Sequence, residues 1–387
     1  MFESPAAVLA ILATVAAFFF WLEKASRWKL FTLFPPLLFI YGVPVILSNT
    51  GVLPKQSDAY TVLSTFGLPV FITLLLLSVD IGSAFRVMGK GVFVMLLGTV
   101  GVVVGAPVGY FVVHRWLPDD AWKGFGALAG SWIGGTGNMA AVAGGLETPP
   151  AIFGLAVLAD NLIYVIWLPI LLGSKAFADR FNKWARVSED RLEKMESAAK
   201  QEAATRVEGT FEMYHLLYLA AIALSAAAIS GWVAPMLPVV EPILSTSTWR
   251  VLLVTTFGIF LSFTPARTIP RSHQIAMAIV YIFVAGMGAR ASLEGLADAP
   301  AFLLGAAIWI VIHGLFCLLG AWIFHVDVHS AAIASAANVG GAASAPVVAA
   351  YHRESLVPVA ILMALIGYAI GNYAAFLAAR LCFWVGG

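Results

Sequence analysis

The chain has 387 residues, of which 61% are hydrophobic and only 11% are charged, with a mean hydropathy of +0.91. Soluble domains carry about 25% charged residues, so this composition excludes an ordinary soluble protein and indicates a polytopic membrane protein in a lipid bilayer. The formal net charge of +1 provides no basic face, so no nucleic-acid partner is expected.

The first apolar stretch, residues 5–23, could be mistaken for a secretory signal peptide. Glu3 stands where a signal peptide has a basic region, and no small-residue cleavage site follows the apolar run. Positive charge comes afterwards, at Lys24, Arg27 and Lys29. The sequence therefore predicts a retained first span whose following loop faces the cytoplasm.

About 20 mostly apolar residues are needed to cross a bilayer, and this rule predicts about twelve transmembrane spans. The span at 249–265 is the weakest, because it is short and ends in Pro265. The expected fold is an all-α polytopic membrane protein. The predicted spans are residues 5–23, 30–48, 59–82, 91–114, 122–146, 150–173, 213–234, 249–265, 274–291, 300–324, 329–350 and 355–383.

One long hydrophilic segment, residues 174–212, interrupts this series. Its acidic and basic residues alternate, which is typical of a solvated helix with ion pairs four residues apart. We interpret it as a charged linker between an N-terminal transmembrane half, residues 1–173, and a C-terminal half, residues 213–387.

The span at 122–146 has a centre that an ordinary transmembrane helix avoids, with the sequence SWIGGTGN. Glycine costs roughly 1 kcal/mol relative to alanine inside a helix, and Asn138 has amide groups that lipid cannot satisfy. Irregular backbone is tolerated at membrane depth only where protein buries it or where it lines a water-filled cavity. The sequence therefore predicts a broken helix at a binding site.

The two halves resemble each other at this point. A shift of 206 residues aligns SWIGGTGNMAAVA with ANVGGAASAPVVA, so that Gly134 and Gly135 match Gly340 and Gly341. Glycine-interrupted spans at corresponding positions of two halves are a sequence indicator of a transporter's substrate site. A second broken helix is therefore expected at 329–350.

The distribution of basic residues leaves the orientation of the halves open. Arg86 and Lys90 place the loop after the third span inside, whereas Arg267 and Arg271 place the loop after the eighth span inside, which has the opposite parity. Opposite preferences favour an inverted repeat. Twelve full spans would instead make the repeats parallel, so either 249–265 is not a simple crossing or another boundary is wrong.

Asp160 is the acidic residue that lies deepest within a predicted span. A charge at the bilayer centre costs from roughly 3 to over 10 kcal/mol, so such residues are functional candidates. Two interpretations remain: Asp160 binds Na⁺ or carries a proton, or a protonated Asp160 makes a structural hydrogen bond. Hard cations prefer oxygen ligands, which Asp160, Asn161, Asn138, Thr136 and opened backbone can supply.

A second set of small and polar residues is predicted to line the substrate site. Helix N-termini at the breaks would favour an anionic group such as a carboxylate. The predicted substrate-binding residues are Ser131, Gly134, Gly135, Gly137, Asn338, Gly340, Gly341 and Ser344.

The remaining polar groups favour structural interpretations. His325, Asp327 and His329 could form a metal site but are more typical of a solvated loop. His313 could relay protons or be a satisfied buried imidazole. The motifs of P-loop ATPases, zincins and serine hydrolases are missing from the sequence, so neither an enzyme nor a cofactor is expected beyond Na⁺ or H⁺ as coupling ion.

Four motifs carry a resemblance to a known family. They are GSWIGGTGNMAAVA, ADNL at 159–162, ANVGG at 337–341 and GYAIGNYAAFLA at 367–378. With these motifs, the chain resembles the YjcL-like bacterial membrane proteins, a domain-of-unknown-function family placed with cation/proton antiporters and sodium-coupled anion symporters. The resemblance implies inverted repeats, two crossing broken helices, a panel-like second domain, elevator-type or rocking transport, a homodimer and a bacterial inner-membrane location.

The resemblance also implies a role for Asp160. Antiporters of the superfamily carry paired Asp-Asp or Asn-Asp residues in the span after the first broken helix, where this chain has Asp160-Asn161 in reversed order. They often have a lysine in the last span, but here no basic residue precedes Arg380 in that span. The expected function is Na⁺- or H⁺-coupled transport of a small carboxylate-bearing solute, such as an amino acid, peptide or cell-wall fragment. The alternatives are a cation/proton antiporter without an organic substrate and a membrane-embedded enzyme.

Overall fold

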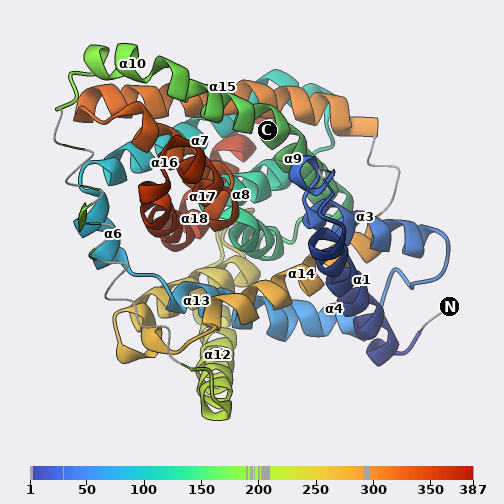
Figure 1. Ribbon diagram of the computed structural model, residues 1–387. Coiled ribbons are helices and arrows are strands. Elements are labelled where there is room, and N and C mark those ends of the chain that lie inside the picture. Colours follow the sequence, from blue (N-terminus) through green and yellow to red (C-terminus); the bar gives the residue numbers. More distant parts are fainter. Residues whose placement is uncertain are drawn as a thin grey trace.

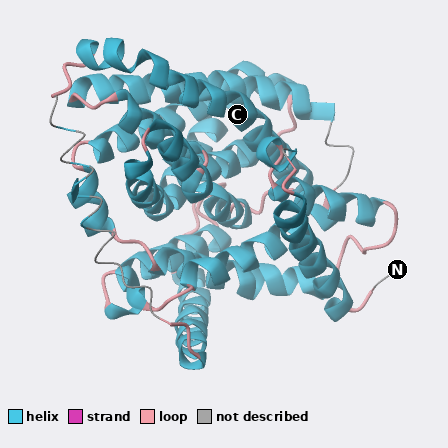
Figure 2. Cartoon of the chain, in the orientation of Figure 1, coloured by secondary structure: helices cyan, strands magenta, loops and turns pink. Residues whose placement is uncertain are grey.

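The computed structural model describes residues 3–28, 30–188, 191, 195, 197–198, 201, 210–291 and 297–386. Across these residues the chain is almost entirely helical, and β-structure is limited to an isolated bridge between Val240 and Leu244 (Figure 2). Within the charged segment 174–212, residues 189–190, 192–194, 196, 199–200 and 202–209 lie outside the described residues.

The helices of the N-terminal half follow each other with short connections. Asp58–Leu77 forms one rod, in which a π-helical segment joins two α-helices. The elements are α1 (Pro5–Ser26), α2 (Leu30–Leu33), α3 (Pro36–Asn49), α4 (Asp58–Val62), the π-helical η1 (Leu63–Gly67), α5 (Leu68–Leu77), α6 (Ile81–Met88), α7 (Gly91–Val113), α8 (Ala121–Gly145), α9 (Pro150–Gly173) and α10 (Ala178–Trp184).

The helices of the C-terminal half follow the linker. They are α12 (Met213–Val233), α13 (Thr246–Ser262), α14 (Ser272–Arg290), α15 (Ala299–Phe324), α16 (Val328–Val339), α17 (Gly341–His352) and α18 (Val357–Gly386).

Within the described residues, eight helices are long and apolar enough to cross a membrane, so the expected count of twelve spans is not confirmed. Two of the other predicted spans are short, since α3 has 14 residues and α13 has 17. The remaining two are the glycine-rich stretches, where α8 is interrupted inside and residues 329–350 divide into α16 and α17. The chain is nevertheless a multi-pass membrane protein.

The helices form two groups, which Figure 1 shows in the upper and lower parts of the molecule. In the upper group, α7 packs along α15, and α8 packs along α18. In the lower group, α14 lies against α3 and α5, while α13 also packs on α5. We call these the hairpin layer (α7–α9 and α15–α18) and the support layer (α1, α3–α5 and α12–α14).

Small residues allow the hairpin layer to pack tightly. A Cβ atom at Gly109 of α7 would lie 2.4 Å from the backbone oxygen of Gly305 of α15, so only glycine fits there. Two turns earlier on α7, the Val102 carbonyl accepts a hydrogen bond of 2.8 Å from the Trp309 indole of α15. Helix pairs inside membranes commonly use small residues in this way to bring their backbones together.

The first glycine-rich span is not a helix that crosses the membrane with a break, but a helix that turns back on itself. At Gly135 the backbone leaves the helical region, with φ 74° and ψ −172°. A Cβ atom at Gly126 would lie 2.8 Å from the Leu146 side chain, whereas a straight helix would separate these positions by about 30 Å. Residues 121–145 therefore form a helical hairpin, which we call hairpin 1.

The second glycine-rich span folds in the same way. The Nδ1 atom of His329, at the start of α16, lies 2.9 Å from Nδ1 of His352, at the end of α17. A continuous helix would hold residues 23 positions apart at a distance of about 35 Å. At Gly341 the φ angle is 58°, which allows the turn between the two arms. Residues 328–352 form hairpin 2.

The tips of the two hairpins touch. A Cβ atom at Gly341 would lie 3.5 Å from the Cα atom of Gly135, and the Tyr368 side chain of α18 lies beside both glycines. The prediction of two crossing broken helices is therefore corrected to two hairpins that meet tip to tip. The breaks lie where the sequence predicts them, at the second glycine of each Gly-Gly pair.

Candidate functional site

Asp160 lies on α9 beside the first arm of hairpin 1. Its Oδ1 atom accepts a hydrogen bond of 3.0 Å from the indole Nε1 of Trp132, and the Ser131 hydroxyl lies close to the same carboxyl group. The Trp132 ring packs on Trp309 with 4.6 Å between ring centroids. The Asp160 residue is partly exposed, and the indole bond fixes the orientation of its carboxyl group.

Tyr164, one helical turn after Asp160, reaches the tip of hairpin 2. A Cβ atom at Gly340 would lie 3.1 Å from the Tyr164 ring and also against Ser344, so these two side chains surround this side of the tip. The Tyr164 hydroxyl is buried and has no hydrogen-bond partner among the described residues. Sequence reasoning missed Tyr164, although its spacing of four from Asp160 places both residues on one face of α9.

Asn161 does not join Asp160 in the site. Its side chain is buried, and its Nδ2 atom donates a hydrogen bond of 2.7 Å to the Val157 carbonyl, one turn back in the same helix. Asparagine often satisfies its amide on its own backbone in this way. The two neighbouring residues that the sequence predicts as joint ion ligands therefore point to different surroundings.

Asn138 connects hairpin 1 to α18. Its Nδ2 atom donates a hydrogen bond of 3.1 Å to the Tyr368 carbonyl, and its amide fits between Gly134 of the first arm and Gly371 of α18. Because a Cβ atom at either glycine would collide with this amide, the two glycines provide room for it. Asn138 thus fixes the hairpin near its tip, and Gly134 serves this packing.

Thr136 and Gly137 begin the second arm of hairpin 1. Thr136 directly follows the break at Gly135, and its side chain is partly exposed. A Cβ atom at Gly137 would lie 2.5 Å from the Leu75 side chain of α5. Gly137 therefore allows the hairpin to contact the support layer, while Thr136 remains a candidate to contact a ligand at the tip.

Asn338 lies near the end of the first arm of hairpin 2. Its Nδ2 atom donates a hydrogen bond of 3.1 Å to the Met95 carbonyl of α7. Its Oδ1 atom is buried and has no partner among the described residues. A buried amide oxygen without a donor is costly, and such oxygens are also suitable ligands for a hard cation.

A buried hydrogen-bonded cluster that sequence reasoning did not identify holds the arm of hairpin 2. The Ser335 hydroxyl accepts a hydrogen bond of 3.0 Å from the Trp167 indole and lies 2.9 Å from Nε2 of His313. The other ring nitrogen, Nδ1 of His313, lies 2.9 Å from the Gly98 carbonyl. Both nitrogens of this fully buried ring have partners, which supports the interpretation of His313 as a satisfied imidazole.

The residues of the HVDVHS loop have separate partners. Asp327 caps the start of α16 and lies 3.3 Å from Arg191, while Nδ1 of His325 lies 2.7 Å from the Ala185 carbonyl. His329 faces His352. In the part of the chain that the structure describes, three or more His, Cys, Asp or Glu side chains do not gather into a group able to hold a metal ion.

Two other polar residues connect the layers. The Asn372 amide of α18 donates a hydrogen bond of 2.8 Å to the Thr255 hydroxyl of α13. Glu147, just after hairpin 1, accepts a hydrogen bond from the Ser247 hydroxyl of α13. Both bonds join the hairpin layer to α13 of the support layer.

Comparison with known proteins identifies the family. A family described as "Protein of unknown function (DUF819)" matches residues 10–383, which include both hairpins and Asp160. The chain is also 26% identical over 343 residues, 85% of each chain, to the "Uncharacterized membrane protein YjcL" of Bacillus subtilis (strain 168). Because the family match covers almost the whole sequence, the chain belongs to the DUF819 family of membrane proteins.

Proposed function

We propose that the protein is a secondary active transporter that couples movement of Na⁺ or H⁺ to transport of a small carboxylate-bearing solute. The observation that carries the proposal is the contact between the tips of the two hairpins, with Asp160 beside the first of them. Irregular backbone inside a bilayer is found where protein buries it or where it lines a polar cavity, and transporters place substrate and ion there.

The hairpins suggest how the two halves are related. If each hairpin enters and leaves on one side, five crossings remain in each half, counting α2 and α3 as one crossing and α4 and α5 as another. An odd number of crossings places the second half upside down relative to the first, as in inverted repeats. The helix contacts support this relation if α1, α3 and α5 correspond to α12, α13 and α14. The contact of α3 with α14 then corresponds to that of α13 with α5, and the contact of α1 with α14 corresponds to that of α12 with α5.

This topology removes the conflict in the distribution of basic residues. The loops that carry Lys24, Arg86 and Arg267 now all lie on one side, as the positive-inside rule requires. An ion pair of 3.5 Å between Arg267 and Asp80 joins two of these loops. With this orientation, hairpin 1 opens to the outside of the cell and hairpin 2 to the cytoplasm.

The ion and the solute would meet at the tips. Asp160 would carry the coupling ion, with the Ser131 hydroxyl and the carbonyl groups freed at Gly135 as further oxygen ligands. The second arm of each hairpin begins at its tip, after Gly135 and at Gly341. Both helix N-termini therefore point their unpaired N–H groups toward the junction, which favours a carboxylate.

The two layers provide the movable parts. The hairpin layer contains the tips and Asp160, and we propose that it moves against the support layer to expose the site alternately to either side. A homodimer joined through the support layer in the bacterial inner membrane is part of the same proposal. Exposed apolar side chains on α1 and α12, such as Trp21 and Trp232, provide surface for lipid or for a second copy.

Reconstituted vesicles test the proposal. Purified protein is screened for metabolites that raise its thermal stability in the presence of Na⁺, and uptake of each hit is measured under an imposed Na⁺ or H⁺ gradient. We expect gradient-driven uptake, and its loss in Asp160→Ala and Asp160→Asn. Full uptake by both variants would exclude the assignment of the ion to Asp160, while Na⁺-dependent proton release without any solute would favour a cation/proton antiporter.

A further inference from the structure

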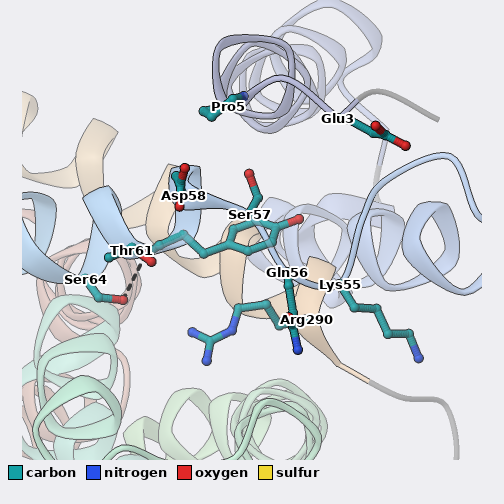
Figure 3. Close-up of a pocket in the computed structure, with 10 residues that line it drawn as sticks. Glu3, Pro5, Lys55, Gln56, Ser57, Asp58, Thr61, Ser64 and Arg290 are labelled. Atoms are coloured by element: carbon teal, nitrogen blue, oxygen red, sulfur yellow. Dashed lines mark hydrogen bonds between the residues drawn. The ribbon is translucent and has the colours of Figure 1, made fainter.

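Two adjoining hollows lie on the proposed outer side, and the inner of them borders hairpin 1. The outer hollow has a volume of about 680 Å³ and is lined by residues of the α3–α4 connection and the start of α4, among them Lys55 and Asp58 (Figure 3). The inner hollow, of about 510 Å³, lies between the end of hairpin 1 and helices η1, α13 and α14. Ser64 and Arg290 line both hollows, so the hollows adjoin at these two residues.

Arg290 stands at the boundary between the hollows. It is the last residue of α14, and its side chain is exposed. Figure 3 shows its guanidinium group extending below Thr61 and Ser64, while the Lys55 side chain points the other way. Because Arg290 lines both hollows, its guanidinium group can contact a ligand in either of them.

Arg250 lines the inner hollow and is anchored by the π-helical segment. Its Nη2 atom donates a hydrogen bond to the Thr65 carbonyl within η1. A π-helical turn departs from the usual backbone pairing and is often found at functional sites. The Nε atom of Arg250 is buried and lacks a partner in the described part of the chain, so this guanidinium group has bonding capacity left over.

One carboxylate faces these two cations. Glu147 lies at the edge of the inner hollow, where it accepts the hydrogen bond from Ser247. Within the described residues it does not come within ion-pair distance of Arg250 or Arg290. The inner hollow therefore has two guanidinium groups against one carboxylate, whereas the outer hollow balances Lys55 and Arg290 against Glu3 and Asp58.

We propose that the inner hollow is the outer entry site of the transporter, where Arg250 and Arg290 bind the carboxylate of the solute before it reaches the hairpin tips. Ala143 and Gly144 line this hollow and belong to the second arm of hairpin 1, which begins just after the tip. The proposal rests on the transport function proposed above and adds the residues that select an anionic solute. It leaves the coupling ion with Asp160.

Charged thiol reagents test the anion preference without knowledge of the solute. Ser64, which lines both hollows, is replaced in a Ser64→Cys variant that also carries Cys317→Ala and Cys382→Ala. The purified protein reacts with two methanethiosulfonates of similar size, one ending in a sulfonate and one in a trimethylammonium group. We expect Arg250→Gln or Arg290→Gln to lower the ratio of the sulfonate rate to the trimethylammonium rate by about fivefold, because loss of one positive charge from the hollow slows the sulfonate reagent and speeds the trimethylammonium reagent.

Matched variants distinguish the effect of charges that line the hollow from the effect of the net charge of the protein. Glu147→Gln is expected to raise the ratio, and Arg267→Gln, on the opposite side of the molecule, to leave it unchanged. Unchanged ratios in both arginine variants, or a Ser64→Cys thiol that reacts with neither reagent, would overturn the proposal. If Arg250→Gln does not fold, the variant at the exposed Arg290 decides the result alone.

The outcome is separable from that of the transport assay. The reaction rates require neither a gradient nor a transported solute, so a failure of Asp160-dependent uptake would leave the ratio unaffected. Conversely, an unchanged ratio of reaction rates together with Asp160-dependent uptake would contradict the proposed entry site and support the proposed transport function. If the ratio of reaction rates falls as expected and uptake depends on Asp160, Arg290→Gln should raise the solute concentration needed for half-maximal uptake and leave the dependence on Na⁺ or H⁺ unchanged.

Discussion

The Trp132 indole donates a hydrogen bond of 3.0 Å to Oδ1 of Asp160, and so connects the first arm of hairpin 1 to the acidic residue of α9. Trp132 is fully buried against Trp309, which in turn is bonded to the Val102 carbonyl of α7. The carboxyl group is thus oriented through a chain of rigid rings. If a coupling ion binds at Asp160, its binding geometry depends on the position of hairpin 1.

The first prediction concerns this bond. Trp132→Phe keeps an aromatic ring against Trp309 but removes the N–H group that faces Asp160. A hydrogen bond to a charged group contributes about 1.5–3 kcal/mol, so we expect the cation concentration for half-maximal uptake to change by about tenfold or more. Trp249→Phe, which loses an indole hydrogen bond to the Pro238 carbonyl near the start of α13, is the control. Equal cation dependence in the two variants would contradict a role of Trp132 at the ion site.

The second prediction concerns the folding back of hairpin 1. Asp120 and Glu147 are exposed residues just before and just after the hairpin. We expect Asp120→Cys and Glu147→Cys, each without the native cysteines, to react with a membrane-impermeant maleimide from the outside of intact cells. A helix that crosses the membrane would place the two positions on opposite sides, so labelling of only one of them would contradict the hairpin.

The corresponding experiment on hairpin 2 should give the opposite side. His325 and Glu354 are exposed at the two ends of residues 328–352. Both His325→Cys and Glu354→Cys are expected to react only after the membrane is permeabilised. Labelling of both from outside would keep the hairpin but exclude the inverted relation between the halves.

The sequence allows the tips to be located, but not the folding back. The offset of 206 residues aligns Gly135 with Gly341, and these are the two glycines with positive φ at the tips. Hydropathy, however, cannot distinguish a span of 25 residues from a hairpin of the same length. The distinguishing feature is the close approach of Gly130 to the Asn138 backbone, which depends on the return of the chain.

For a similar reason, the sequence identifies some residues of the site and not others. Asp160 could be identified because an acidic residue deep inside a span is costly and rare. Asn161 follows it directly in the sequence, but neighbours on an α-helix point about 100° apart, and the Asn161 amide bonds the Val157 carbonyl instead. Trp132 and Tyr164 could not be distinguished from other apolar aromatic residues, because their roles depend on contacts across helices.

The third prediction compares two glycines of hairpin 1. A Cβ atom at Gly130 would lie 2.8 Å from the Asn138 backbone oxygen, so Gly130→Ala forces the arms apart, and overpacking of this kind costs about 1–3 kcal/mol. At Gly135 the nearest atoms are 3.7 Å away, so Gly135→Ala meets only the strain of a backbone conformation that essentially only glycine adopts, about 1–3 kcal/mol. Both variants should unfold at lower temperature in detergent.

Gly173→Ala is the control for this pair, because nothing lies within 4 Å of the added Cβ atom and its φ is not positive. We expect its unfolding temperature to equal or exceed that of the unmodified protein, since alanine favours a helix. If Gly130→Ala unfolds at the same temperature as Gly173→Ala, the two arms of hairpin 1 are not in contact.

The fourth prediction concerns the buried cluster of Trp167, His313 and Ser335. Ser335→Ala removes the hydroxyl group that pairs with the Trp167 indole and with Nε2 of His313. A buried polar group without a partner costs about 1–3 kcal/mol, so this variant should be clearly less stable. Adding Trp167→Phe removes one of the two orphaned groups, so the double variant should lose less stability than the sum of the single variants.

Unfolding midpoints of the two single variants and the double variant measure this coupling. Ser174→Ala, whose hydroxyl bonds the Leu171 carbonyl of its own helix, gives the cost of a local bond. Strict additivity between Trp167→Phe and Ser335→Ala would show that the cluster does not hold α9 to hairpin 2.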